Sequence, residues 1–388
     1  AVPRVFGFGT ATLAFGVQGV AGSGDLLAHD PESQLQGETA NCLVQAGRLG
    51  MHACWLGKLG RDWIGSRVLE ELEDEGVDCS GALLDEALCS PFRVEIAGTE
   101  PRTVRLPNAL AKLQIHDVEF LADQVNAGEW VVVEVAEIPA PTLSAFCSRA
   151  RRRQARVLMT VDLDPIRQLE ADPVEMQMLL AQADLLVPNQ AAIRPLCENG
   201  NPEIMSADLA RRYRCVVVLW TTAGTWYCDA SGLGDELAAC STGGTVHASG
   251  CEAAFRGGLL AGLARGDSLP DALSLGSLCA VRTGSVPGSR AGMPRATELA
   301  LDQRHPTGAR PHVADVGAVG NLIVSLTSAQ SPDTPLVVTT LSGADLPLSL
   351  PESSDFAINF GQDVFVGTDS TYILTFEVVG GLEEVDVC

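Results

Sequence analysis

Residues 246–258, Val-His-Ala-Ser-Gly-Cys-Glu-Ala-Ala-Phe-Arg-Gly-Gly, join an apolar segment to one rich in Gly, Ala and Leu. This composition predicts a helix that begins after Gly250 and extends through Leu263, with unpaired backbone N–H groups in its first turn. Such a helix start readily binds phosphate. In this chain, however, Glu252 adds a carboxylate to that first turn, and the adjacent Ala253 has no group that can accept a proton. The segment has the frame of a phosphate-binding loop without its chemistry.

On the amino-terminal side of this segment, short apolar runs alternate with stretches of helical spacing. The predicted strands are Val5–Phe8, Ala53–Leu56, Trp130–Val135, Arg156–Val161, Leu185–Pro188, Cys215–Trp220 and Trp226–Asp229. The predicted helices are Thr39–Leu49, Ile64–Glu75, Pro141–Arg153, Val174–Ala183 and Ala207–Arg212. This alternation predicts an α/β fold, with a mostly parallel sheet covered by helices on both faces. Ligands of such sheets bind at the carboxyl ends of the strands.

Two regions depart from this pattern. Residues 10–36 are rich in Gly and look irregular, and residues 90–106 predict a pair of edge strands that turn at Gly98. Residues 311–388 contain no Lys or Arg and have β-branched runs separated by Pro, Ser, Asp and Gly. A disordered tail is the alternative, but the aromatic side chains of this region favour a folded unit. We therefore expect two domains, residues 1–303 and an acidic, β-rich extension over residues 304–388.

Composition excludes several classes of function. The 388-residue chain has a formal net charge of −23, which argues against direct binding to nucleic acid. It has no apolar stretch of the roughly 18 residues that a membrane span needs. The 12 cysteines form no Cys-x-x-Cys pair. We therefore expect free, buried thiols in a reducing compartment, with no metal site.

Several motifs occur in an order that resembles the ribokinase-like, or PfkB-type, carbohydrate kinases over roughly residues 5–303. They are Gly37-x-x-x-Asn41, Arg48-Leu49-Gly50, Gly57-Lys58-Leu59-Gly60-x-Asp62-x-x-Gly65, Glu75-Gly76-Val77-Asp78, Asp164-Pro165 with Arg167, Pro188-Asn189, and Gly250 with Ala254-Phe255 and Gly257-Gly258. The resemblance implies a Rossmann-like core with a small β lid, whose elements we expect around residues 10–36 and 90–106. It also implies ATP- and Mg²⁺-dependent phosphorylation of a sugar or nucleoside hydroxyl.

The chain departs from the family pattern where that chemistry would take place. The family resembled here has Asp-Thr-x-Gly-Ala-Gly-Asp-Ala-Phe, and alignment on Gly250 and Ala254-Phe255 puts Ala253 at the catalytic aspartate. Loss of a general base typically costs about 10²–10⁴ in rate. Glu252 replaces a glycine next to the phosphate, where a carboxylate adds bulk and like-charge repulsion. We therefore expect no catalytic residue.

Three further positions agree with this expectation. The acid of the family's Asn-x-x-Glu motif is Ala192, and residues 10–20 lack the acid that the resemblance implies for binding sugar hydroxyls. The first glycine of its Thr-x-Gly-x-x-Gly segment falls near Thr221, whereas Gly224 is kept. Neither a metal ion nor another cofactor is expected.

The leading hypothesis is a catalytically inactive member that serves as a structural or scaffolding subunit, with other protein subunits as partners. It resembles the degenerate fructokinase-like proteins known as accessory subunits of plastid assemblies. The chain begins without Met, which fits an organelle protein, such as one of the chloroplast, after removal of a targeting peptide; the alternative location is the cytoplasm.

Two alternatives stay open. One is an active kinase that uses ATP and Mg²⁺ with a relocated base, either His247 or Asp164. The other is a sensor that binds a sugar or nucleotide without turnover. The candidate ligand-binding residues are Gly37, Asn41, Asp164, Asn189, Gly224 and Gly250.

Overall fold

The computed structural model describes residues 2–19, 26–27, 33–97, 102–105, 108–161, 173–197, 200–221, 224–238, 250–286, 288–299, 321–328, 331–341 and 372–379. The chain divides into two compact units, Ala1–Arg304 and His305–Cys388. Among the helices of the described residues, none has the length and apolar character needed to cross a membrane.

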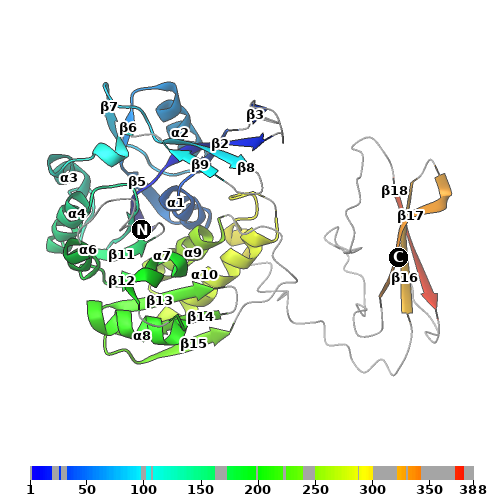
Figure 1. Cartoon of the computed structure of the whole chain (residues 1–388). Coiled ribbons are helices and arrows are strands. Elements are labelled where there is room, and N and C mark those ends of the chain that lie inside the picture. Colours follow the sequence, from blue (N-terminus) through cyan, green and yellow to red (C-terminus); the bar gives the residue numbers. More distant parts are fainter. Residues whose placement is uncertain are drawn as a thin grey trace. The chain divides into compact units, whose positions relative to one another are not determined.

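The first unit is built on a sheet of eight described strands in the order β15-β14-β13-β12-β11-β10-β1-β5 (Figure 1). Their bounds are β1 (Arg4–Phe8), β5 (His52–Leu56), β10 (Trp130–Val135), β11 (Arg156–Val161), β12 (Leu185–Leu186), β13 (Val216–Thr221), β14 (Gly224–Cys228) and β15 (Gly234–Ala238). The strands from β5 to β13 pair in parallel, whereas β14 and β15 are antiparallel. The predicted, mostly parallel α/β sheet is confirmed.

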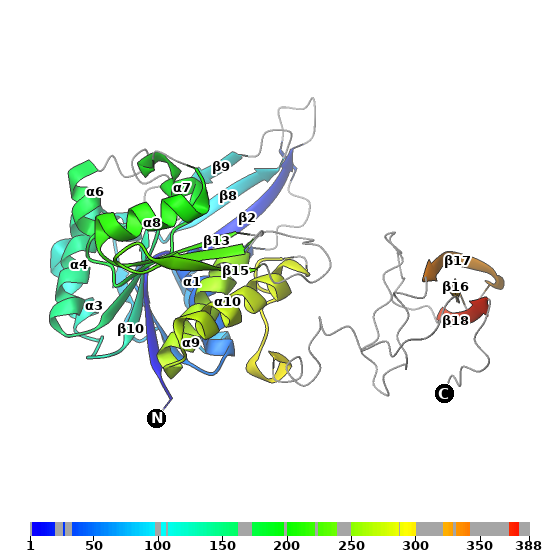
Figure 2. The ribbon, with the colours of Figure 1, turned by 90° about the horizontal axis from the view of Figure 1, so that it is seen from below.

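Helices cover both faces of this sheet (Figure 2). One face packs against α1 (Glu38–Arg48), α2 (Trp63–Asp74), α9 (Cys251–Arg265) and α10 (Leu269–Gly284). The other packs against α3 (Ile115–Ala122), α4 (Ala140–Arg152), α6 (Pro173–Leu180), α7 (Gln190–Ile193) and α8 (Pro202–Tyr213). Short 3-10 helices span Leu110–Lys112 and Arg194–Leu196. Alternate strand side chains enter the two apolar cores, as Val132 and Val133 do from β10.

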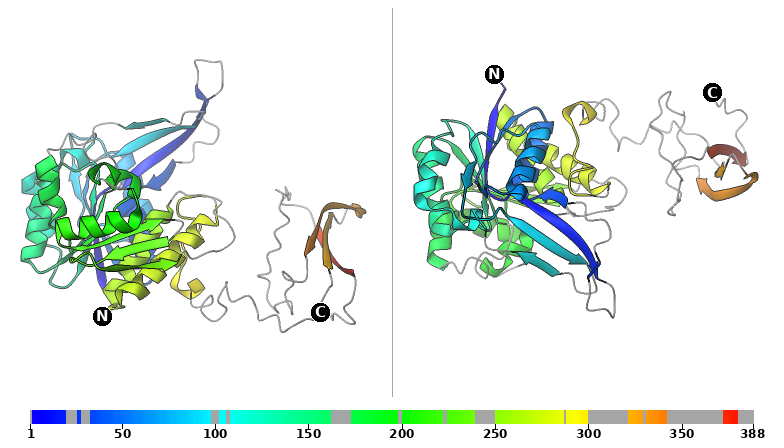
Figure 3. Two further views of the ribbon diagram at one scale, coloured as in Figure 1. Left: turned by 60° about the horizontal axis from the view of Figure 1, so that its bottom comes forward. Right: turned by 90° about the horizontal axis from the view of Figure 1, so that it is seen from above.

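A smaller sheet projects from the core as a lid (Figure 3). It contains β2 (Thr12–Gly19), β3 (Leu26–Leu27), β4 (Ser33–Gln36), β8 (Phe92–Ala97) and β9 (Arg102–Arg105) in the order β3-β2-β8-β9, with β4 paired to β2. The expectation that residues 10–36 are irregular is wrong for β2 and β4. Parallel pairing of β2 with β8 supplies the backbone partners that compensate for the glycines of this segment. Two further short strands, β6 (Lys58–Gly60) and β7 (Leu83–Asp85), pair with each other.

The second unit contains an antiparallel sheet of three described strands in the order β17-β16-β18. They are β16 (Asn321–Ser328), β17 (Ser331–Leu341) and β18 (Tyr372–Val379). The sequence predicts strands at 321–326, 335–341 and 372–379, which lie within these three. The two other predicted strands, at 356–360 and 363–367, are outside the described residues.

Several elements of the first unit differ from the sequence prediction. Helix α8 begins at Pro202 rather than Ala207, because the Asn201 side chain accepts a hydrogen bond from Glu203 N at 2.9 Å and Pro202 suits the first helical position. Strand β15 and helices α3 and α10 are not predicted from the sequence.

Candidate active site

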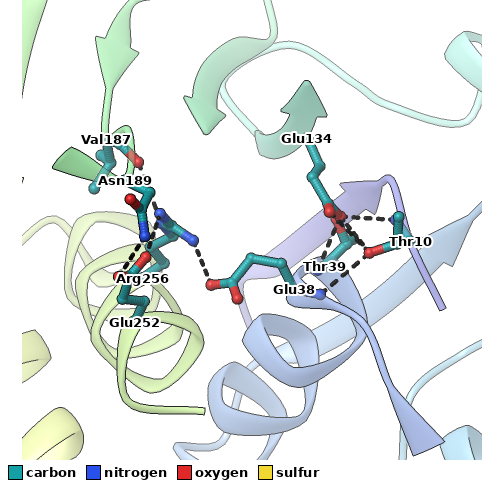
Figure 4. A network of polar contacts seen from close by, with 8 residues as sticks. All are labelled: Thr10, Glu38, Thr39, Glu134, Val187, Asn189, Glu252 and Arg256. Carbon is teal, nitrogen blue, oxygen red and sulfur yellow. Dashed lines mark hydrogen bonds and ion pairs between the residues drawn. The ribbon is translucent and has the colours of Figure 1, made fainter. Parts of the chain in front are cut away.

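Two neighbouring parallel strands, β1 and β10, end side by side at the carboxyl edge of the sheet, because Phe8 pairs with Val133. The next residue of β10 is Glu134, whose side chain is buried. Its carboxylate accepts hydrogen bonds from Thr10 N at 2.8 Å, from Thr10 Oγ1 at 2.7 Å and from Thr39 Oγ1 at 2.7 Å (Figure 4). The Glu134 carboxylate is therefore bound by the protein's own donors.

Glycines allow this close approach. A Cβ at Gly9 would lie 2.6 Å from the Cβ of Glu134, and a Cβ at Gly37 would lie 2.4 Å from the carbonyl oxygen of Thr10. Gly37 also has φ +116° at the amino end of α1. The predicted binding residue Gly37 thus brings the start of α1 against the end of β1, where Glu38 N donates to Thr10 Oγ1 at 3.2 Å.

The first turn of α9 lies on the other side of this edge. Gly250 precedes the helix with φ +81°, and a Cβ there would lie 2.0 Å from the carbonyl oxygen of Ser289. Ala253 is fully buried. The Glu252 carboxylate accepts hydrogen bonds from Asn189 Nδ2 at 2.7 Å and from Arg256 Nη2 at 3.2 Å. The first turn of the helix therefore contains a carboxylate of the protein itself, that of Glu252, which is held by two donors.

Arg256 is the residue that sequence reasoning missed. Its side chain is 2 % exposed and donates to the Val187 carbonyl oxygen at 3.2 Å. It also forms ion pairs with Glu38 and Glu252 (Figure 4). One guanidinium thus joins α9, the end of β12 and the start of α1. Arg256 is the one charged residue in the apolar, Gly-rich run of residues 253–264, and this is the signal that could have revealed it.

Asn189, a predicted ligand contact, is fully engaged inside the protein. Its Oδ1 caps α7 by accepting from Ala191 N at 2.8 Å and Ala192 N at 3.2 Å, and its Nδ2 binds Glu252. Ala192 contributes only its backbone to this cap. Where the family motif has an acid, the Ala192 side chain offers no oxygen to a metal ion.

Asn41 has a different environment. It lies on α1, which packs against α9, and it is buried. Its Oδ1 has no hydrogen-bond partner among the described residues. A buried amide oxygen without a partner is costly and is an acceptor that a ligand hydroxyl could satisfy.

Three predicted site residues remain: Gly224, His247 and Asp164. Gly224 begins β14 and pairs with Thr221 of β13, and Gly224 N donates a hydrogen bond to Thr221 Oγ1 at 3.2 Å. His247 and Asp164, the two candidates for a relocated base, lie outside the described residues.

Cys251 at the helix start is not an activated thiol. Burial raises its pKa above the ordinary value, and the neighbouring Glu252 carboxylate acts in the same direction. A helix N-terminus normally lowers a cysteine pKa, so the surroundings outweigh the dipole here. This thiol is a buried packing group.

The chain is similar to known carbohydrate kinases both in sequence and in structure. Residues 10–296 match the model of the pfkB family carbohydrate kinases. The 2-dehydro-3-deoxygluconokinase of Bacillus subtilis is 23% identical over 277 residues, which are 69% of this chain and 85% of that protein. Ribokinase from Thermotoga maritima superposes with a TM-score of 0.64 at 16% identity, over 78% of this chain and 99% of that one. Aminoimidazole riboside kinase from Salmonella enterica, complexed with aminoimidazole riboside and an ATP analogue, gives 0.63 at 22% identity, over 77% and 99%.

Proposed function

The chain belongs to the pfkB family of carbohydrate kinases, and we propose that it is a member without phosphoryl-transfer activity that serves as a structural subunit of a larger assembly. The fold of a sugar kinase is present in the first unit.

The first turn of α9 carries the proposal. Phosphoryl transfer to a hydroxyl needs a base for its proton and free N–H groups for the charge that develops on the phosphoryl group. Ala253 occupies the base position implied by the family motif and carries a buried methyl group. Glu252 places a carboxylate in the same turn, fixed by Asn189 and Arg256. The base is therefore missing, and a fixed carboxylate lies in the same turn as the N–H groups that would face the phosphoryl group.

Electrostatics argue in the same direction. Two acids, Glu38 and Glu252, share one cation, Arg256, so the formal net charge of these three residues is −1. A nucleotide phosphate that approached α9 would meet this negative charge and would have to displace Glu252 from its partners. We expect this competition to weaken nucleotide binding.

The sugar side is also occupied. The oxygens of Glu134 already accept hydrogen bonds from Thr10 and Thr39 at the end of β1. A sugar hydroxyl would have to replace these buried, charge-assisted bonds, which are stronger than neutral ones. This network supports a structural role for Glu134.

A second candidate function is a sensor that binds a sugar or nucleotide without turnover. The unpartnered Oδ1 of Asn41 favours it, because a ligand hydroxyl would satisfy that buried acceptor. An active kinase with His247 or Asp164 as base is a third reading, and it rests on the sequence alone.

Ligand binding separates the sensor from the structural subunit. Thermal unfolding would be measured on the full chain with Mg²⁺–ATP, fructose, ribose, aminoimidazole riboside or 2-dehydro-3-deoxygluconate. The structural proposal predicts no shift with any of them, because a ligand stabilises only the state that it binds. A saturable shift with a sugar that Asn41→Leu abolishes would establish the sensor instead.

The native size of the protein tests the structural role. We expect the endogenous chain to migrate in a much larger complex than the purified chain, with the acidic unit His305–Cys388 as a contact element. Loss of the large species after deletion of this unit would support the proposed contact. An endogenous chain that migrates alone would refute the structural role.

A further inference from the structure

A cluster of metal-binding side chains lies at the amino-terminal edge of the main sheet, opposite the candidate active site. It consists of His52, Cys54 and Asp78, whose ligand atoms all lie within 4.8 Å of one another. His52 begins β5, and it pairs in parallel with Arg4 at the beginning of β1. The cluster is therefore remote from the strand ends that carry Thr10 and Glu134.

Backbone pairing explains why these three residues meet. Successive strand side chains alternate between faces, so His52 and Cys54 share one face of β5. Asp78 forms an isolated parallel bridge with Cys54. Two backbone hydrogen bonds fix this bridge, from Asp78 N to Ala53 O at 2.8 Å and from Trp55 N to Asp78 O at 2.9 Å. The separation of Asp78 from His52-x-Cys54 in the sequence hides the set from any search for metal-ligand spacing.

The geometry approaches that of a tetrahedral zinc site. Ordinary Zn–N, Zn–O and Zn–S bond lengths place tetrahedral N and O ligands about 3.4 Å apart and S and O ligands about 3.6 Å apart. His52 Nε2 lies 3.3 Å from Asp78 Oδ2, and Cys54 Sγ lies 4.0 Å from the same oxygen. The distance between Cys54 Sγ and Asp78 Oδ2 would have to shorten by about 0.4 Å. The His52 side chain is 49% exposed, so it leaves room for a bound water. We propose that His52, Cys54 and Asp78 bind one Zn²⁺ ion, with water as the fourth ligand.

The Asp78 carboxylate is already held in a position from which it could bind the metal ion. Asp78 Oδ1 accepts a hydrogen bond from Ser80 N at 2.9 Å, which leaves Oδ2 directed to His52 and Cys54. Hydrogen bonds from Ser80, and the nearby His52, keep the pKa of Asp78 below its ordinary value. Outer hydrogen bonds of this kind commonly orient metal ligands.

The charges of the ligands and of the Zn²⁺ ion would balance in the occupied site. Zn²⁺ would displace the proton of the Cys54 thiol to solvent, and the thiolate and the Asp78 carboxylate would then neutralise the ion. Arg4, whose Nη2 lies 3.9 Å from Cys54 Sγ, is itself paired with Glu129 at 3.6 Å. The metal would join β5 to the segment that follows α2.

Binding of Co²⁺, a spectroscopic substitute for Zn²⁺, tests the site on the metal-depleted full chain. We expect one Co²⁺ per chain, with a thiolate-to-metal charge-transfer band and the visible absorption of a tetrahedral ion, both displaced by Zn²⁺. Cys54→Ser should abolish the thiolate band. His52→Ala, which changes an exposed side chain and leaves the core intact, should weaken Zn²⁺ affinity at least about tenfold.

Matched variants exclude other sources of binding. Cys89→Ser removes an exposed thiol outside the cluster, and His116→Ala removes an exposed histidine that contacts Asp117. Both should keep the band and the affinity of the unaltered chain. The proposal is overturned if no thiolate band forms, if Cys89→Ser removes the band, or if His52→Ala leaves Zn²⁺ affinity unchanged.

Discussion

Helix α9 contains two sets of residues that meet different requirements. Its glycines, Gly257, Gly258 and Gly262, pack so closely on α1 and α10 that any added Cβ would lie 2.5 to 2.9 Å from the nearest atom. Its first turn and the residue Arg256 form the polar cluster with Glu38 and Asn189. Gly257 and Gly258 match the family motif, whereas Glu252 and Ala253 in the first turn depart from it. Packing and chemistry are thus separable within a single helix.

Substitution of a packing glycine should have the largest effect on stability. In Gly258→Ala, the new Cβ would lie 2.9 Å from the backbone Cα of Gly276 and 3.0 Å from Cys279 Sγ. Backbone atoms cannot rotate away, so we expect a loss of about 3 kcal/mol in the free energy of unfolding, measured with urea.

The matched control is Gly47→Ala in α1. A Cβ there would meet its nearest atoms at 3.8 Å, which is ordinary contact. We expect this variant to be about 0.5–1 kcal/mol more stable, because alanine is the better helix former. Equal effects of the two substitutions would contradict the distinction between packing glycines and others.

Removal of the buried cation should have the next largest effect. Arg256→Met would leave Glu38 and Glu252 facing each other without their shared partner. We expect a loss of about 2 kcal/mol in unfolding free energy, at the lower end for a broken pair because both acids are partly exposed.

Arg265→Met on the same helix is the control, because Arg265 pairs with Asp267 at the surface. It should cost no more than about 0.5 kcal/mol. If Arg256→Met is as mild as this control, Arg256 does not hold the three segments together.

Substitution of Asp62, an acid that matches the family motif, should have a smaller effect on stability. Its Oδ1 accepts from Gly65 N at 2.7 Å and caps α2, and its Oδ2 accepts from Ser90 N at 2.8 Å. Asp62→Ala should therefore cost about 1 kcal/mol in unfolding free energy at neutral pH. The surface acid Asp235 provides the comparison, since Asp235→Ala should be nearly neutral.

The stability that Asp62 contributes to the folded chain should depend on pH. Burial acts to raise the pKa of this carboxyl, but bonds from Ser90 and Gly65 outweigh it and hold the pKa below the ordinary value of 3.8. A depressed pKa in the folded state gives stability that is present above pH 3.8 and is lost as the pH falls through the folded value. The difference between the unaltered chain and Asp62→Ala should shrink below about pH 4. A difference that grows there would contradict a capping role for the ionised acid.

The sequence predicts the fold better than it predicts the site, and particular residues explain why. Glycine spacing around α9 and the alternation of apolar strands are local in the chain, so they indicate the core directly. The partners of Arg256 are not local: Glu38 is 218 residues away and Val187 is 69 residues away. In the sequence, nothing distinguishes Glu134 from the other residues of a buried strand. Its partners become visible only in the folded chain, where Thr10 after β1 and Thr39 of α1 donate hydrogen bonds to its carboxylate. His247 and Asp164 stay predictions.

The most direct test of the central claim is ATP-dependent turnover by the purified, unaltered chain. ADP release would be measured with Mg²⁺–ATP and each sugar of the binding panel, against reactions without sugar and against an active ribokinase. Because Ala253 offers no base and Glu252 occupies the first turn of α9, we predict no sugar-dependent ADP above the blank. Sugar-dependent turnover that His247→Ala abolishes would contradict the account and establish an active kinase with a relocated base.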